Sequence, residues 1–231
     1  MRFRPWYIVL IVAAFFATAC GAGGFGSQAN DSESSAAPSV LVPHVQSDWD
    51  ANGRKIKPTA ILLHWWAGWD NGHNIDRLVN DAKKNESRYN PDLKSTDKHP
   101  IVGHVTVQVG VTADGKAYQL TPTLDTFARH AKCANPWAIG IEIEGSDKKS
   151  GHYIGDNKTQ FNGVVAVVKE LMAKYNIKAE SVVANNGRSG RGIVSHKQVD
   201  AQCQWADGAP AGDGKPDVDD AYLNRVLAAV K

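Results

Sequence analysis

The stretch Ile139-Gly140-Ile141-Glu142-Ile143-Glu144 decides the fold class, because an isoleucine occupies every second position. In an extended chain, successive side chains point to opposite faces. The isoleucines therefore share one face, and Gly140, Glu142 and Glu144 share the other. This alternation predicts a β-strand over 138–144 with its isoleucine face in the core.

Apolar runs on both sides of this stretch predict further strands, and segments with helical spacing separate them. Strands are expected over 59–64, 102–111, 116–120 and 193–196, and helices over 75–83, 159–176 and 221–230. The turn sequence Ala113-Asp114-Gly115 predicts a hairpin between two of these strands. Strands interleaved with helices predict an α/β fold, a single domain with a central mixed β-sheet flanked by helices.

The N-terminus has the order of features of an export signal. Arg2 and Arg4 precede an apolar stretch, and the small residues Ala17-Thr18-Ala19 precede Cys20. This order is typical of a secretory signal peptide over 1–20, and it resembles a lipoprotein processing site in which Cys20 becomes the lipidated first residue. Ordinary signal cleavage and an uncleaved anchor are the alternatives, and all three predict export to the cell envelope or beyond.

The residues after the signal divide into a linker and one domain. Residues 21–44 are rich in Gly, Ser and Ala, so they bury too little surface to offset the entropy of ordering, and we expect a flexible linker. Residues 45–231 have the length of a single domain. The formal charge of +2 comes from Arg2 and Arg4, so the mature chain is balanced. This balance argues against a nucleic-acid partner.

The cysteines suggest an oxidising compartment. If Cys20 carries lipid, Cys133 and Cys203 remain as a pair, and we expect a disulfide between them.

Glu142 is a candidate general base. A carboxylate on a buried strand is costly unless it is paired or functional, and burial raises its pKa towards the operating pH. Gly140 leaves space beside Glu142 for a ligand. The alternative is a half-exposed strand with two solvent-facing glutamates, and for Glu144 we favour that alternative.

Two histidines each close an apolar run, and a carboxylate follows late in the chain. These segments are Ile61-Leu62-Leu63-His64, Ile193-Val194-Ser195-His196 and Lys215-Pro216-Asp217. Two imidazoles and a carboxylate leave a fourth zinc position open for water, as hydrolytic sites require. Each residue alone is more often structural, as a hydrogen-bonded histidine or part of a surface turn. Together with Glu142 as base and Lys215, they predict an exported zinc hydrolase.

Three tryptophans follow His64 closely: Trp65, Trp66 and Trp69. They suggest an apolar wall that stacks against a sugar ring or holds a peptide, and core or interface aromatics are the alternative.

The chain resembles the zinc-dependent N-acetylmuramoyl-L-alanine amidases, whose fold is shared with peptidoglycan recognition proteins. The resemblance covers about 59–231. Its segments, in the expected order, are Ile61-Leu62-Leu63-His64, Asp114-Gly115-Lys116-Ala117-Tyr118-Gln119-Leu120, Arg129-His130-Ala131, Ile139-Gly140-Ile141-Glu142-Ile143-Glu144-Gly145, Ser195-His196 and Lys215-Pro216-Asp217. The isoleucine segment and the ordered set are specific, whereas each histidine alone is not.

The resemblance implies a role for each of these residues. His64, His196 and Asp217 would bind Zn²⁺. Glu142 would be the base that activates the metal-bound water, and Lys215 would stabilise the oxyanion formed at the amide carbonyl. His130, in the stretch that follows the hairpin, would lie by the substrate groove. The implied substrate is peptidoglycan or a muropeptide, cut between N-acetylmuramic acid and L-alanine.

The sequence departs from the family pattern at three places. The segment 200–214 is longer than in compact members and contains Cys203, a rival third ligand because some members use cysteine. Gly103 stands where several relatives carry a catalytic tyrosine, which puts more weight on Glu142. A valine follows Asp217 where proline is common.

Two other functions stay open on the sequence. The same groove could recognise muropeptide without cutting it, as a non-catalytic binding module. A cysteine hydrolase would use Cys203 or Cys133 with a histidine, although a disulfide would consume both thiols.

Overall fold

The structure is a computed structural model of the 231-residue chain and describes residues 39–44, 54–66, 75–76, 78–79, 107–145, 153–204 and 217–231. The predicted signal peptide, Cys20 and Lys215 lie outside these ranges, as do Trp69 and Gly103. The described residues belong to one unit, Pro38–Lys231. Among them, no helix is both long and apolar enough to cross a membrane.

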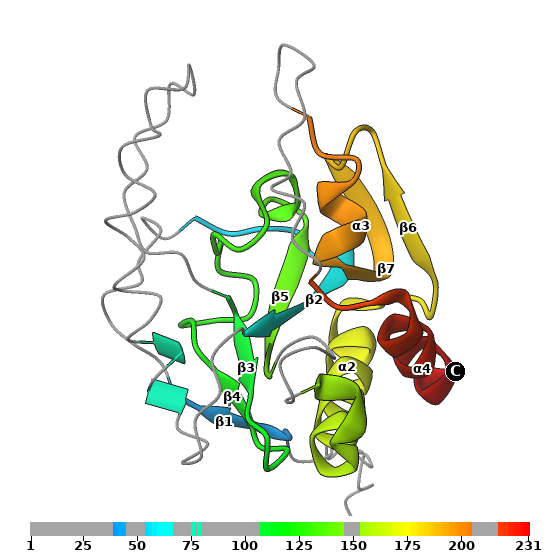
Figure 1. Cartoon of the computed structure of the whole chain (residues 1–231). Helices are drawn as coiled ribbons and strands as arrows, with labels where there is room; N and C mark the ends of the chain where they lie inside the picture. The colour runs from blue at the N-terminus through cyan, green and yellow to red at the C-terminus, as the bar shows by residue number, and fades with distance from the viewer. Residues whose placement is uncertain are drawn as a thin grey trace, which may run out of the picture. The chain divides into compact units, whose positions relative to one another are not determined.

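A mixed seven-stranded sheet, in the order β1-β4-β3-β5-β2-β7-β6, organises this unit (Figure 1). The strands are β1 (Leu41–Pro43), β2 (Ala60–Trp66), β3 (Val109–Val111), β4 (Ala117–Gln119), β5 (Ala138–Glu144), β6 (Ser181–Ala184) and β7 (Ser189–Ser195). The β3–β4 and β6–β7 pairs are antiparallel, and the other pairs are parallel. The predicted α/β fold with a central mixed sheet is confirmed.

β5 and β2 form the centre of the sheet because their residues are apolar at most positions. The isoleucines of β5 are fully buried, as their alternation predicts. The two strands run parallel in a register that sets Leu62 beside Gly140 and His64 beside Glu142. This register places the two candidate residues next to each other on one face of the sheet.

Two helices cover the isoleucine face (Figure 1). They are α2 (Lys158–Tyr175) and α4 (Asp220–Val230). The side chain of Asn157 caps α2 by accepting a hydrogen bond from the N–H of Gln160, and Asn176 ends it in a left-handed conformation. Apolar residues of α2 at helical spacing pack on the isoleucines in the largest core cluster. Both helices agree with the predicted ranges to within one residue.

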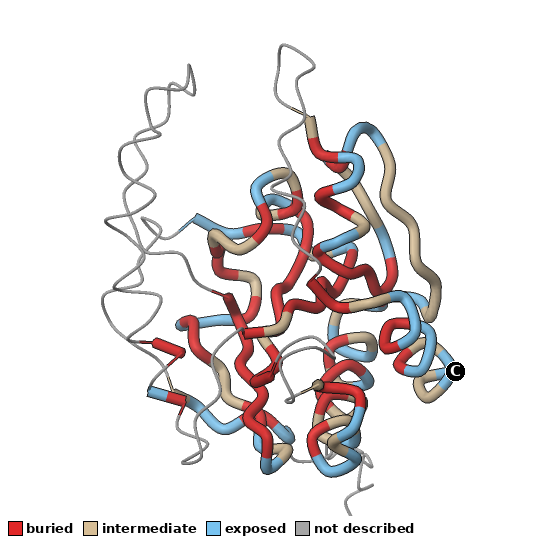
Figure 2. The backbone as a smooth tube through the Cα atoms, viewed as in Figure 1, coloured by how far each residue is buried: buried red, intermediate tan, exposed pale blue. Residues whose placement is uncertain are grey.

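The opposite face of the sheet carries the short helix α3 (His196–Asp200), the 3₁₀ turn η2 (Lys132–Ala134) and two smaller apolar clusters. A second 3₁₀ turn, η4 (Ile154–Asp156), precedes α2. Figure 2 shows the buried backbone running through the central strands. His64 and Glu142 lie on this second face, and so the fold positions them under α3 and η2 rather than under the long helices.

Several boundaries differ from the prediction. β7 starts at Ser189 and has an edge partner, β6, that was not expected, and His196 opens α3 instead of closing the strand. β1 pairs with β4 although it lies in the range predicted as linker, 21–44. The predicted hairpin is present as β3–β4. Of the predicted helix over 75–83, residues 75–76 and 78–79 are helical and the rest lies outside the described residues.

Candidate metal centre

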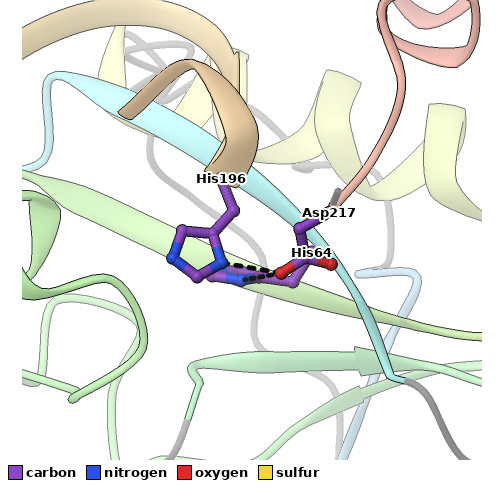
Figure 3. Close-up of side chains that lie close together, drawn as sticks. All are labelled: His64, His196 and Asp217. Carbon is purple, nitrogen blue, oxygen red and sulfur yellow. Dashed lines mark hydrogen bonds and ion pairs between the residues drawn. The ribbon is translucent and has the colours of Figure 1, made fainter. Parts of the chain in front are cut away.

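His64, His196 and Asp217 converge from three separate elements (Figure 3). His64 lies in β2, His196 is the first residue of α3, and Asp217 precedes α4. Nδ1 of His196 lies 2.6 Å from Oδ2 of Asp217, and Nδ1 of His64 lies 3.3 Å from the same oxygen. All three residues are buried, and their ligand atoms lie within 4.8 Å of one another. The structure thus brings together the three residues that the sequence proposed as metal ligands.

Backbone register and capping place the two histidines. β2 and β7 run parallel with Leu63 beside Ser195, so His64 and His196 follow at neighbouring positions. Ser195 forms a capping box with Gln198, which turns the chain from strand to helix at this point. His196 therefore enters the site from the first turn of α3, while His64 enters it from the sheet.

Asp217 is held by backbone groups of both neighbouring elements. The N–H of Trp65 donates to its Oδ1 at 2.9 Å, and the N–H of Lys197 donates to its carbonyl oxygen at 3.3 Å. The following residue, Val218, has φ of 48°, which is rare for a β-branched residue. Asp219 then caps α4. The proline that the family resemblance leads us to expect at this position could not adopt this positive φ.

The electrostatics of the cluster follow from these contacts. Burial opposes the charged form of Asp217, but hydrogen bonds with His196 and His64 outweigh it and hold the pKa of Asp217 well below its usual range. Burial also opposes the charged form of His196, but its close contacts with the carboxylates of Asp200 and Asp217 raise its pKa to about 9. Without a metal ion, the cluster is therefore a buried ion pair.

His130 contacts His64 directly and fills the space above Gly140. Its Nδ1 lies 3.0 Å from Nε2 of His64, and its Nε2 lies 3.3 Å from the carbonyl oxygen of Ala138. A Cβ at Gly140 would lie 2.8 Å from Cγ of His130. The space that the sequence assigned to a ligand is thus occupied by the His130 ring. Burial, with the charges of His64 and His196, holds the pKa of His130 well below its usual range.

The neutral His130 ring sets the orientation of His64. A carbonyl oxygen can only accept, so Nε2 of His130 donates to Ala138 and Nδ1 accepts from Nε2–H of His64. The lone pair that His64 could offer to a metal ion is then the one on Nδ1, the nitrogen that faces the cluster; without a metal ion, Nδ1 donates to Oδ2 of Asp217. This assignment of hydrogens is an inference from the partners of each nitrogen.

Glu142 lies beside the cluster, as the register requires. Its Oε2 is 3.8 Å from Nδ1 of His64, and its side chain is 20% exposed. A partly exposed carboxylate next to a candidate metal site is accessible to water and to substrate. Glu144, by contrast, is fully buried, so the expectation that it faces solvent is wrong. Its carboxylate accepts a hydrogen bond from the N–H of Ala113 at 2.6 Å and thereby fixes the β3–β4 turn.

The side chains of Trp65 and Trp66, which the sequence proposes for substrate contact, pack in apolar clusters. The Trp65 side chain packs on the isoleucine-face core, and Trp66 is 7% exposed and belongs to the apolar cluster with Ile75 and Leu78. Among the described hydrogen bonds of Trp65, the one that reaches the site is donated by its backbone N–H to Asp217. Lys215 lies outside the described residues.

Cys203 is bonded to Cys133 in a disulfide, as expected, with a Cα–Cα distance of 5.8 Å. A bonded sulfur has no thiolate to offer, so Cys203 is excluded as a rival metal ligand and neither cysteine can act as a nucleophile. Asp200 is a site residue that the sequence analysis missed. Its spacing of four from His196 would have indicated a contact had α3 been predicted.

The donor set is suited to a metal ion. Two imidazole nitrogens and one carboxylate oxygen, all buried, form the three-ligand arrangement of catalytic zinc sites, which leaves a position for water or substrate. The site is therefore a candidate metal centre with a carboxylate at its edge.

The fold is similar to that of a solved hydrolase structure, and weaker matches to two further solved structures accompany it. The hydrolase AmiA from Staphylococcus aureus, in complex with its ligand, is 15% identical over 84% of this chain and 82% of that chain, with a TM-score of 0.50. The amidase LysC from Clostridium intestinale is 18% identical over 75% of this chain and 85% of that chain, with a TM-score of 0.45. The Ph2119 endolysin from a Thermus scotoductus bacteriophage is 17% identical over 75% and 87%, with a TM-score of 0.46. At 15% identity, the likeness to AmiA concerns the fold alone.

Among curated proteins, no relative matches the sequence. The family model described as N-acetylmuramoyl-L-alanine amidase matches residues 53–210, a range that includes His64, Glu142 and His196 and ends before Asp217. Because this match spans more than half of the chain, the chain belongs to the N-acetylmuramoyl-L-alanine amidase family.

Proposed function

We propose that this protein is an exported zinc-dependent hydrolase that cleaves the amide bond between N-acetylmuramic acid and L-alanine in the peptidoglycan stem peptide. The observation that carries the proposal is the convergence of His64, His196 and Asp217 on one buried point beside Glu142. Membership of the amidase family supports peptidoglycan as the substrate. The buried nitrogen and carboxylate donors support zinc as the metal.

The chain's own residues would divide the work of hydrolysis. His64 and His196 would hold the metal through Nδ1, and Asp217 through Oδ2. When bound, Zn²⁺ supplies a Lewis acid that polarises the amide carbonyl and lowers the pKa of water to about 7. Glu142 would take a proton from the attacking water and give it to the departing amine.

Lys215 is proposed to stabilise the negative charge that forms on the carbonyl oxygen during attack. This proposal rests on the sequence, in which Lys215 precedes Asp217 by two positions. The contacts of His130, Trp65 and Trp66 give no support for direct substrate binding, since His130 bonds to His64 and the two indoles pack in apolar clusters.

We further propose that residues 1–20 direct export and that a lipid on Cys20 anchors the protein to the membrane. Intact peptidoglycan, the proposed substrate, lies outside the cell membrane, which supports this location. The amidase domain would then comprise β1 together with residues 45–231, at the end of a flexible linker.

The variant Glu142→Gln tests the role of the base. Glutamine has the same shape but cannot take a proton, so release of the stem peptide should fall about 100- to 10,000-fold while zinc remains bound. The matched control is Glu180→Gln, since Glu180 forms an ion pair with Arg191 on the surface. Turnover by the Glu142 variant within a few-fold of wild type, at equal zinc content, would remove Glu142 from the mechanism.

A further inference from the structure

Asp200 approaches the metal centre from behind His196. Both residues belong to α3, at positions four apart, so their side chains lie on the same face of the helix. Oδ1 of Asp200 is 3.2 Å from Nε2 of His196, the nitrogen that faces away from Asp217. His196 therefore lies between two carboxylates, one on each ring nitrogen.

The Asp200 carboxylate is buried, with its side chain 3% exposed. Among the described residues, neither of its oxygens has a well-aligned hydrogen-bond partner, so the contact with His196 is the main compensation that the structure offers. A buried carboxylate without compensation is costly. A polar or apolar residue of similar size would fit this position in α3 at lower cost, and so the charge calls for a functional reason.

We infer that Asp200 is a positioning residue for the metal centre. It keeps the ring hydrogen of His196 on Nε2, so that the Nδ1 lone pair points at the metal beside Oδ2 of Asp217. A carboxylate on the distal nitrogen of a ligating histidine also raises the basicity of the ligating nitrogen. The inference rests on the proposed function, since it assumes that His196 binds a metal ion.

The two histidines differ in this respect. Nε2 of His64 faces a neutral imidazole, His130, which is fixed by the carbonyl oxygen of Ala138. Nε2 of His196 faces the carboxylate of Asp200. His196 is therefore the stronger electron donor of the two, and its contribution to metal affinity depends on Asp200.

The test measures zinc affinity in the full-length protein by competition with a chromophoric chelator. Asp200→Ala removes the acceptor, and we expect about 10- to 100-fold weaker zinc binding. Asp200→Asn keeps the shape and an acceptor oxygen but loses the charge, so its affinity should lie between those of Asp200→Ala and wild type. Asp220→Asn, an exposed aspartate in α4, is the matched control and should bind zinc as wild type does.

A second readout separates positioning from a general effect on folding. Imidazole ¹⁵N signals of the zinc-loaded wild type should show His196 with its hydrogen on Nε2, and Asp200→Asn should shift that signal. Thermal unfolding of the metal-free variants reports whether they fold.

The outcomes distinguish the inference from the proposed function. If wild type binds zinc and both Asp200 variants bind it equally tightly, Asp200 has no positioning role, and the proposed metal centre still stands. A hydrogen found on Nδ1 of His196 in the zinc-loaded protein also overturns it. Wild type that binds no zinc overturns the metal centre itself, and the inference with it.

Discussion

At the scale of single residues, Gly140 determines how closely β5 approaches the histidines. The ring of His130 occupies the volume that any larger side chain at position 140 would need. This contact holds His130 against His64, and so the missing side chain of a glycine contributes to the geometry of the metal centre.

Gly140→Ala should destabilise the fold and weaken zinc binding together. The new methyl group would lie 2.8 Å from Cγ of His130 and would push the ring away from His64. We expect a loss of about 1–3 kcal/mol in the free energy of unfolding, measured by urea denaturation. Gly163→Ala is the control. Its methyl group would crowd the backbone of Gly115 from α2, away from the metal centre, so zinc affinity should stay unchanged.

Combining Gly140→Ala with His130→Ala should recover part of the lost unfolding energy, because the cavity of one change accepts the methyl group of the other. If the losses in unfolding free energy of the two single variants simply add in the double variant, the contact between position 140 and His130 is contradicted.

The sequence identified most of the candidate site at this scale. His64, Glu142 and His196 could be proposed because each interrupts or closes an apolar run of the sequence, where a polar group needs a reason. The burial of Glu144 could not be predicted in this way, because it depends on a hydrogen bond from Ala113, which lies 31 residues away in the sequence. The position of His130 over Gly140 likewise depends on the path of η2, which has no periodic pattern.

At the scale of elements, the disulfide ties two parts of the site together. Cys133 lies in η2, three residues after His130. Cys203 lies three residues after Asp200, the last residue of α3. The short helix α3 has few residues of its own to bury, so its position depends on its neighbours. The bridge fixes its C-terminal end beside the loop that carries His130.

Replacing both cysteines by alanine should lower the free energy of unfolding by about 4 kcal/mol, since the bridge closes a loop with a sequence separation of 70. The measurement is urea denaturation of the oxidised wild type and the double variant, both metal-free. The single variants, each with one free thiol, serve as controls and should lose a similar amount. A difference below about 1 kcal/mol would show that the bridge adds little to stability.

The long elements were predictable because their patterns repeat: β5, α2 and α4 agree with the expected ranges. β6 was missed, although Asn185, Asn186 and Gly187 have positive φ and form the type of turn that joins a hairpin. The strands on either side of that turn show no clear alternation of apolar and polar residues, so the sequence pattern does not indicate a hairpin here. β1 was missed because three residues at an edge carry too short a pattern.

At the scale of the whole molecule, the metal-free protein should depend on pH through His196. Its pKa is about 9 in the folded chain, above the ordinary histidine value of about 6.5 in the unfolded chain. The resulting stability is fully present below pH 6.5 and is lost as the pH rises through 9. We therefore expect the melting temperature in the presence of a chelator to fall between pH 6.5 and pH 9.

His196→Asn is the control, because it lacks the titrating group and should lose most of this slope. Zinc-saturated wild type should also lose it, since metal binding requires the histidine without its added proton. A melting temperature of the chelated wild type that rises over the same interval would contradict the ion pair between His196 and its carboxylates.

The most direct test of the central claim, zinc-dependent cleavage beside L-alanine, follows release of free N-terminal alanine from a muramyl-peptide by the full-length protein. The account expects release that stops when a chelator removes the metal and returns when zinc is restored. Release that continues at the same rate in the metal-free protein would contradict a zinc mechanism. A folded protein that binds zinc and the muramyl-peptide but releases no alanine would instead be a recognition module.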